Sequence, residues 1–517
     1  MFRKKKMLLA NRKTAKEDGA KKTVLLHFAF SWLLLVFVSF GMLWLGDKLN
    51  ASGMALTRFM ARVQAPLTAQ FAYTDIKRDQ ITVVMYDQEF LKGSGSAWPI
   101  SYQEHGDALL RLTQDPTGRP KAIFLDITFN QERSDPTIGI LRQALCTIQN
   151  EYKVPVFLAA LPSNSGHLAV RSGLNADFYT RDCFTLVGAD YIPDQLDGVA
   201  WTYQLTRHLT ASGWQNGPSV GAQSEPAYRS AAMAIAQDAG QIDLGQETVP
   251  MALVWGHNSA PQNNRPESLK DCRPGRPDVA QLAPFVLRQL WQSSEMPLCP
   301  YHRTLSMGQI SNMPESELAP YINGRYLMIG ANVPGYNDYA YSPLHSLTPG
   351  VYMHAMALDN LLTYKEKYKL SEEWNMPPSK HFIWPGLLAI SAVFAVHLIW
   401  TFSRKWIYSF LTTEIRFKNA AGLIRFLTQK EDLTPWQRMS KTSFYALTWL
   451  MRISIQTVAA VCLIGILQAW FRIGMLPVVE LVSMTLIAEG LGYMGKVRWV
   501  LFGSSPPVSI AEETTRL

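Results

Sequence analysis

Three aspartates fall where a parallel sheet would bring carboxylates together. Asp87 and Asp126 lie at or near the ends of two apolar runs, and Asp338 lies in the loop after a third. In open parallel sheets, ligands bind at the edge formed by the carboxyl ends of the strands. Carboxylates at such an edge could hold a cation, a cationic ligand or a hydroxyl-rich ligand, or could transfer protons. The sequence therefore gives Asp87, Asp126 and Asp338 as candidate ligand-binding residues.

The same aspartates have a simpler and commoner interpretation. An aspartate after a strand often caps the next helix or meets an arginine, and this explanation is favoured over ligand binding and catalysis. The sequence contains no G-x-S-x-G, no Walker-type phosphate loop and no H-E-x-x-H. We therefore expect no enzyme activity, no catalytic residues, no metal site and no cofactor.

Four of the five cysteines lie between the first and second long apolar runs of the chain. They are Cys146, Cys183, Cys272 and Cys299, whereas Cys462 lies in a later apolar run. An even number of cysteines in an oxidising compartment permits two disulfides, with three possible pairings. The pairing 272–299 closes the shortest loop. We expect at least one disulfide, and name Cys272 and Cys299 as the first candidates.

Apolar strands that alternate with helical patterns fill the central part of the chain. Such runs favour a mostly parallel or mixed sheet with helices on both faces, an α/β domain. The expected strands are 81–88, 121–130, 154–162, 184–193, 201–206, 251–256 and 326–333. The expected helices are 46–75, 102–114, 137–152, 226–240 and 350–364.

The remaining apolar runs predict a membrane protein. Charged residues make up 17% of the chain, against roughly 25% in ordinary soluble proteins. Lys and Arg cluster at 1–23 and 403–444, beside apolar runs of spanning length. By the positive-inside rule both termini should be cytoplasmic and the large domain periplasmic, with the chain in the cytoplasmic (inner) membrane.

The expected organisation has eight segments. They are a basic N-terminus (1–23), four α-helical transmembrane spans (24–45, 382–402, 446–468 and 475–495), an extracytoplasmic domain (46–381), a basic cytoplasmic loop (403–445) and a cytoplasmic tail (496–517).

Two carboxylates lie inside the fourth expected span. Charged side chains are costly inside a membrane and usually face a partner. By depth, Glu489 should lie within reach of Arg452, and Glu480 lies closer to the outer face. A structural ion pair is the favoured interpretation of these intramembrane polar residues.

Six segments of the central region, spread over about 76–364, match a known pattern. They are "VVMYDQEFL", "WPIS", "KAIFLDITFN", "LDGVAW", "YLMIGANVPGYNDYAYSPL" and "TPGVYMHAMALDNLL". In this order they resemble the CHASE2 extracellular sensor domain family. The resemblance implies an extracytoplasmic α/β sensor fold. The chain departs from the family where Ser101 and Tyr102 replace a basic residue that many members carry after Trp-Pro.

Two functions fit these observations. The first is a membrane-anchored sensor or ligand-binding protein that relays to a separate partner, because 403–445 is too short for the output domains of many family members. The second is a structural component of a multiprotein envelope assembly, of a secretion or conjugation type, with the domain as a docking surface. We expect the membrane, a protein partner or a second copy, and a small-molecule ligand as partners, and no nucleic acid.

Overall fold

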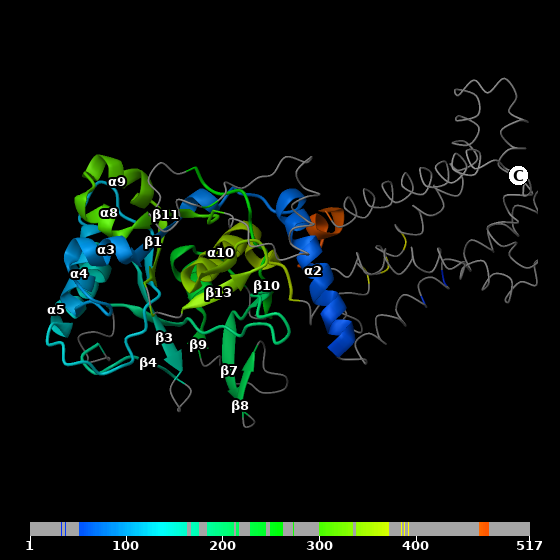
Figure 1. The fold of residues 1–517 in the computed structure, drawn as a ribbon, viewed down its shortest axis with the longest axis horizontal. Coiled ribbons are helices and arrows are strands. Elements are labelled where there is room, and N and C mark those ends of the chain that lie inside the picture. Colours follow the sequence, from blue (N-terminus) through cyan, green and yellow to red (C-terminus); the bar gives the residue numbers. More distant parts are fainter. Residues whose placement is uncertain are drawn as a thin grey trace, which may run out of the picture. The chain divides into compact units, whose positions relative to one another are not determined.

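The chain divides into two compact units, and the computed structural model describes most of one of them. This unit comprises Arg58–Asn375 together with Gln468–Leu476 (Figure 1). The residues that the structure describes are 33, 37, 51–162, 167–174, 183–210, 213–216, 228–244, 249–261, 272, 299–333, 335, 338–371, 384, 387, 391 and 465–474.

A seven-stranded sheet forms the centre of the described unit. Its strand order is β11-β1-β12-β2-β3-β4, and β5 pairs with β3. Every pair is parallel except β3 with β4. The strands are β1 (Ile81–Asp87), β2 (Ala122–Leu125), β3 (Val156–Pro162), β4 (Leu168–Ala169), β5 (Thr185–Gly188), β11 (Arg303–Ser306) and β12 (Tyr326–Asn332). The predicted α/β domain with a mostly parallel sheet is therefore confirmed.

Both faces of this sheet are buried. Side chains alternate along the central strands, so each face contributes to a separate apolar core. Val83 and Met85 of β1 enter one apolar core, and Val84 and Tyr86 enter the other. The first core includes α10 and α6, and the second includes α3, α4, α5, α8 and α9. Figure 1 shows α10 and this second group on opposite sides of the strands. Such a double cover explains why the strands are apolar nearly throughout.

The helices have these bounds in the described part of the chain. They are α2 (Ala51–Phe71), α3 (Gln88–Ser94), α4 (Tyr102–Arg111), α5 (Ile138–Cys146), α6 (Ala231–Ala234), α8 (Met307–Asn312), α9 (Glu315–Ile322) and α10 (Gly350–Tyr364). Short 3-10 turns lie at Arg78–Gln80 and Lys365–Lys367, and π-helical turns at Thr147–Glu151 and Ile235–Ala239.

Ser101 of the "WPIS" segment caps the start of helix α4. The Ser101 side chain accepts from the Glu104 backbone, and the Glu104 carboxylate accepts from the Ser101 backbone. This reciprocal pair is a capping box, which satisfies two amides that a helix start leaves unpaired. Ser101 thus has a local structural role at the position where the chain departs from its family.

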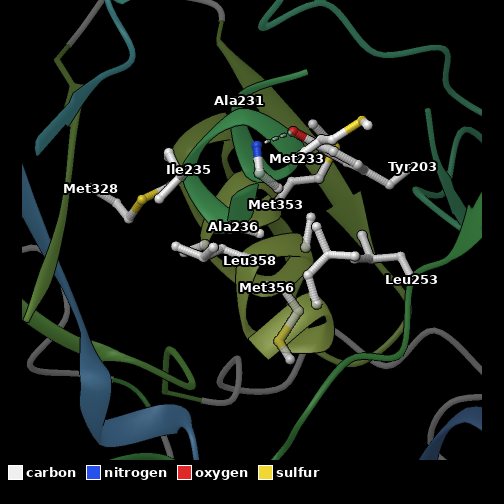
Figure 2. Packing of buried hydrophobic residues seen from close by; sticks show 14 of the residues in the cluster. Tyr203, Ala231, Met233, Ile235, Ala236, Leu253, Met328, Met353, Met356 and Leu358 are labelled. Carbon is white, nitrogen blue, oxygen red and sulfur yellow. Dashed lines mark hydrogen bonds between the residues drawn. The ribbon is translucent and has the colours of Figure 1, made fainter. Parts of the chain in front are cut away.

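Helix α10 is buried along nearly all of its length. Every residue from Gly350 to Leu362 is buried. Figure 2 shows Met353, Met356 and Leu358 inside the first core, with Ala231 and Ile235 of the neighbouring segment beside them. A helix that is apolar on all sides is expected at a core position.

Three small sheets complete the described unit, all with antiparallel pairing. They are β6–β10, the β13–β14 hairpin and β8-β7-β9. Their strands are β6 (Thr202–Tyr203), β7 (Thr206–Thr210), β8 (Gly213–Asn216), β9 (Tyr228–Arg229), β10 (Met251–Ala252), β13 (Tyr339–Ser342) and β14 (Ser346–Pro349).

The transmembrane part of the predicted fold is corrected by the structure. Among the described residues, no helix combines the length and apolar character needed to cross a membrane. The long helix α2 packs instead on the domain, where Arg58 and Arg62 form ion pairs with Asp194 and Asp197. The four predicted spans (24–45, 382–402, 446–468 and 475–495) lie outside the described residues, apart from 33, 37, 384, 387, 391 and 465–468.

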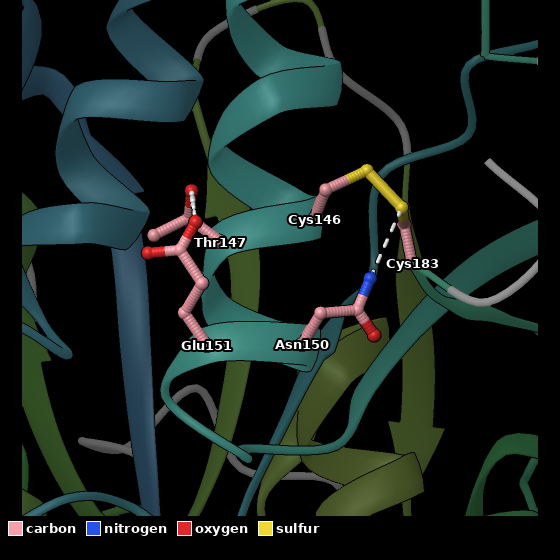
Figure 3. Close-up of a disulfide and its surroundings, with 5 residues drawn as sticks. All are labelled: Cys146, Thr147, Asn150, Glu151 and Cys183. Carbon is pink, nitrogen blue, oxygen red and sulfur yellow. Dashed lines mark hydrogen bonds between the residues drawn. A yellow bond between two sulfur atoms is a disulfide. The ribbon is translucent and has the colours of Figure 1, made fainter. Parts of the chain in front are cut away.

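The four candidate cysteines form two disulfides, and the predicted pairing of Cys272 with Cys299 is confirmed. Cys146 at the end of α5 is joined to Cys183 just before β5, and Figure 3 shows this bond with Asn150 beside it. Cys272 is joined to Cys299. The loops span 37 and 27 residues, so each bond should stabilise the fold by about 4 kcal/mol in the chain-entropy description.

Candidate functional site

Asp126 lies directly after β2, at the carboxyl edge of the parallel sheet. Its backbone N–H donates to the Ile329 carbonyl at 2.7 Å, which continues the pairing with β12 by one residue. Phe124, two residues earlier, faces the α10 core and its ring contacts that of His354. The alternation of the strand therefore turns the Asp126 side chain toward α10.

The Asp126 carboxylate has almost no compensation for its burial. The residue is 5% exposed, and its Oδ2 has no hydrogen-bond partner. The Nε2 atom of His354 is 3.9 Å from Oδ1 of Asp126, too far for a hydrogen bond. Burial, together with the nearby charge of Asp338, raises the pKa of Asp126 well above its ordinary value.

Asp338 lies at the beginning of α10. Its carbonyl accepts from the Gly350 N–H at 2.9 Å, and Gly350 is the first residue of the helix. A Cβ atom at Gly350 would lie 2.4 Å from Asp338 Oδ1, so the glycine makes room for the carboxyl group. Burial raises the pKa of Asp338 to about 6. The helix N-terminus favours the ionised form, but here the cost of burial is larger.

His354 on α10 faces the same place and is neutral near pH 7. Its Nδ1 lies 2.7 Å from the Tyr203 hydroxyl, and both side chains are buried. Burial lowers the pKa of His354 to about 4, although a hydrogen bond to the Ala189 backbone acts in the opposite direction. A neutral imidazole does not offset a carboxylate charge. In the described part of the chain, no Lys or Arg forms an ion pair with Asp126 or Asp338.

Asp87 is not brought to this pair. It is 2% exposed and caps α3, and its Oδ1 accepts from the Phe90 N–H at 3.0 Å. The same oxygen accepts from Ser306 Oγ on β11 at 2.7 Å. Strand β12 separates β1 from β2, so Asp87 bonds toward β11 while Asp126 lies two strands away. The favoured capping interpretation thus describes Asp87, and the ligand interpretation concerns Asp126 and Asp338.

The acidic pair, Asp126 with Asp338, suits proton binding better than metal binding. The described residues contain no group of three or more His, Cys, Asp or Glu side chains arranged to hold a metal ion. One buried and one partly buried carboxylate that interact, without a cation, cannot both ionise cheaply, so at least one keeps its proton. The pair can therefore change its charge by one near the pKa of Asp338.

The predicted intramembrane residues Glu480, Glu489 and Arg452 lie outside the described residues. Two features of the described unit were not predicted from the sequence: Tyr203 beside His354, and a buried lysine, Lys369. Tyr203 lies in a short strand whose pattern gives no sign of a polar contact with α10. Both contacts join residues more than 90 positions apart, which local pattern does not reveal.

Comparison with known proteins agrees with this geometry. The model of the CHASE2 domain matches residues 32–397. The chain belongs to the CHASE2 family. The CHASE2 match includes β1, β2, β12 and α10, and so the whole acidic pair. No curated protein and no solved structure matches the chain. CHASE2 domains form a family of extracellular sensor domains, which is compatible with a sensor role for this chain.

Proposed function

We propose that this CHASE2 protein is an extracytoplasmic sensor in which the acidic pair receives the signal, and that the signal is the proton. The observation that supports this most directly is Asp126 Oδ2, a buried carboxylate oxygen without a hydrogen-bond partner. An unpaired buried polar atom is costly, and folded proteins seldom keep one without a reason. Protonation removes most of that cost. The proposed role is binding and relay, without a catalytic step.

The pair changes charge in a physiological range. Asp338 ionises as pH rises through about 6, because burial raises its pKa to about 6. Burial and the charge of Asp338 raise the pKa of Asp126 well above its ordinary value, and both oppose ionisation of the second carboxyl group. Only one charge is then placed in the site, as expected for two interacting acids.

The groups that face the pair leave Asp338 as the titrating member near neutral pH. From α10 comes His354, whose pKa is lowered to about 4. From β6 comes Tyr203, and from the loop after β5 comes Tyr191, and the pKa of both tyrosines is raised chiefly by burial. Asp190 acts on Tyr203 through its charge, but it forms an ion pair with Arg207. None of these groups supplies a positive charge that would replace the proton.

Ionisation of Asp338 would act on α10. The new charge lies against the first residue of this helix, whose N-terminal amides attract an anion. The protonated form has no such attraction. The two protonation states therefore favour different positions of the 338–349 hairpin against α10, and a separate protein partner would respond to that difference. A ligand shifts an equilibrium only through such differential binding.

Infrared difference spectroscopy on the full-length protein tests the proposal. Between about pH 5 and about pH 7, the carbonyl band of a protonated buried carboxyl should diminish as Asp338 ionises. Asp338→Asn should remove this change. Asp107→Asn, at an exposed position of α4, should keep it as the matched control. A wild-type protein without the band change, or an Asp338→Asn variant that retains it, would refute proton sensing at this site.

A second candidate function is a structural component of an envelope assembly. It is favoured by exposed apolar side chains on the β13–β14 hairpin, where Tyr341 (49% exposed) pairs across the strands with Leu347 (50% exposed). Copurification from native membranes separates the two functions. An assembly component should keep its partners in Asp338→Asn and lose them in a Tyr341→Ser, Leu347→Ser double variant.

A further inference from the structure

Residues 468–474 return to the sensory unit from a distant part of the chain. Ile473 pairs in parallel with Leu370, and the Leu370 N–H donates to the Arg472 carbonyl at 2.9 Å. Arg472 Nε donates to the Tyr368 carbonyl at 3.1 Å, with its guanidinium 4.6 Å from the centre of the Tyr368 ring. We call residues 468–474 the returning segment. It extends the short β6–β10 sheet, because Met251 of β10 also pairs with Leu370.

A buried lysine holds the returning segment in place. Lys369 is 5% exposed, and its Nζ donates to the carbonyls of Gln468 and Phe471, the latter at 2.8 Å. Burial lowers the pKa of this lysine to about 8, so it is still charged at pH 7. Charge-assisted hydrogen bonds to backbone carbonyls are stronger than neutral ones.

The returning segment also contacts α2 and β10 directly. Thr68 Oγ1 of α2 donates to Gln468 Oε1 at 3.0 Å. A Cβ atom at Gly474 would lie only 2.0 Å from the Cβ of Ala252 in β10 and 2.9 Å from the Leu370 carbonyl. Only glycine fits at this contact, since real Cβ atoms do not approach so closely.

This interface is incompletely packed. A small cavity lies between α2, β10 and the returning segment, and its wall includes Gln64, Trp201, Trp255 and Gly474. Gln64 is 2% exposed, yet its Nε2 has no hydrogen-bond partner. A contact surface with a void and an unsatisfied amide is held less tightly than a close-packed core.

A continuous set of contacts joins this interface to the acidic pair. Helix α10 carries His354 beside Asp126 and, less than two turns later, Asn360, whose side chain bonds both the N–H and the carbonyl of Val254. Val254 lies two residues after Ala252, whose N–H donates to the Lys369 carbonyl. Asp359, next to Asn360, accepts from the hydroxyl of Tyr73, just after α2. Movement of α10 therefore displaces both sides of the interface.

We infer that the returning segment is the output element of the sensor, docked on α2 and β10 in one protonation state of the acidic pair and released in the other. This inference rests on the proposed function for its signal. It adds the path by which the signal leaves the domain, since residues 376–467 and 477–517 on either side of the returning segment belong to the other compact unit. The signal leaves the domain through this segment as well as through α2.

Hydrogen exchange of the full-length protein, followed by mass spectrometry at about pH 5 and about pH 7, tests the route. Lys369 stays charged in this range, so a change reports on the acidic pair and not on the lysine. After correction for the intrinsic rate, amide protection in 468–474 should differ between the two conditions by roughly tenfold or more. Asp338→Asn should abolish the difference.

Gly474→Val supplies the release control, because its side chain collides with Ala252. Protection in 468–474 should fall at both pH values, whereas Gly93→Val, at a helical glycine with open space around it, should leave it unchanged. If Gly474→Val does not fold, Lys369→Met takes its place. An infrared titration of Asp338 with no pH-dependent protection in 468–474 would overturn the route and leave proton sensing intact. Absence of the infrared titration would instead refute the proposed function.

Discussion

Two buried ionisable side chains in this molecule, Lys369 and Asp126, differ in their hydrogen-bond partners. Lys369 is 5% exposed and its ammonium group meets two carbonyl oxygens. Asp126 is equally buried, but its Oδ2 accepts no hydrogen bond, and Nε2 of His354 is 3.9 Å from its Oδ1. A buried charge with its hydrogen bonds satisfied contributes to structure, whereas one without them is tolerated in its neutral form. The lysine therefore stabilises the structure in its charged form, whereas burial favours the protonated form of Asp126.

Lys369→Met should give the largest effect. It leaves the carbonyls of Gln468 and Phe471 without their donor, and charge-assisted hydrogen bonds contribute about 1.5–3 kcal/mol each. We expect a loss of about 3 kcal/mol in the free energy of unfolding at neutral pH, measured by urea denaturation. Lys367→Met, at an exposed position two residues earlier, is the control and should change little. An unaltered denaturation midpoint in Lys369→Met would show that Lys369 does not stabilise the fold.

Asp338→Asn should change how stability depends on pH. The pKa of Asp338 is raised from 3.8 to about 6 in the folded protein. Its contribution to stability is therefore fully present below pH 3.8 and is lost as pH rises to about 6. Relative to wild type, the asparagine variant should gain stability across this window by up to about 3 kcal/mol, since one pKa unit corresponds to about 1.4 kcal/mol. Denaturation midpoints at a series of pH values measure this, and a parallel curve for both proteins would contradict it.

His354→Gln should show the opposite slope over almost the same range. The pKa of His354 is lowered from 6.5 to about 4, so its contribution is present above pH 6.5 and is lost as pH falls to about 4. Relative to wild type, the variant should therefore gain stability on acidification, by up to about 3 kcal/mol less the cost of the lost Tyr203 contact. In the wild type, the contributions of Asp338 and His354 to the pH dependence of the free energy of unfolding nearly cancel. The same denaturation series should separate them, and equal signs in the two variants would be inconsistent with the assigned protonation states.

Asp126→Asn should have the smallest effect. The amide replaces a protonated carboxyl of nearly the same shape, and no hydrogen bond or ion pair is broken at Oδ2. We expect stability within about 1 kcal/mol of wild type at neutral pH, with the infrared titration of Asp338 retained. Unfolding curves and resistance to protease provide the measurement. A loss of more than about 2 kcal/mol would mean that Asp126 supports the fold.

Local pattern was enough for the parts of the fold that depend on near neighbours. Helix α10 has the predicted bounds, because Pro349 and Gly350 fix its start and the apolar run continues to Tyr364. Strand β1 was predicted to within one residue. The β13–β14 hairpin and β11 were missed because their strands have only four residues each and gain their burial from distant segments.

The positions of the three candidate aspartates were predicted only in part. Strand order places Asp126 near the loop of Asp338, as the rule for parallel sheets suggests. Asp87 was grouped with them because its position at a strand end is similar, but its partner Ser306 is 219 residues away. The returning segment was predicted as a span end and an outer turn. Its contact with Lys369 bridges 99 residues, and hydropathy carries no sign of it.

The burial of α10 limits how the proposed signal could pass through the domain. With every side chain from Gly350 to Leu362 enclosed, the helix has no wet face on which it could roll or slide without repacking its surroundings. Close-packed interiors resist compression and shift between discrete arrangements. A displacement of the first turn of α10 should therefore reach its last turn with little change. We therefore expect small displacements of α10 and a switch-like change between discrete arrangements.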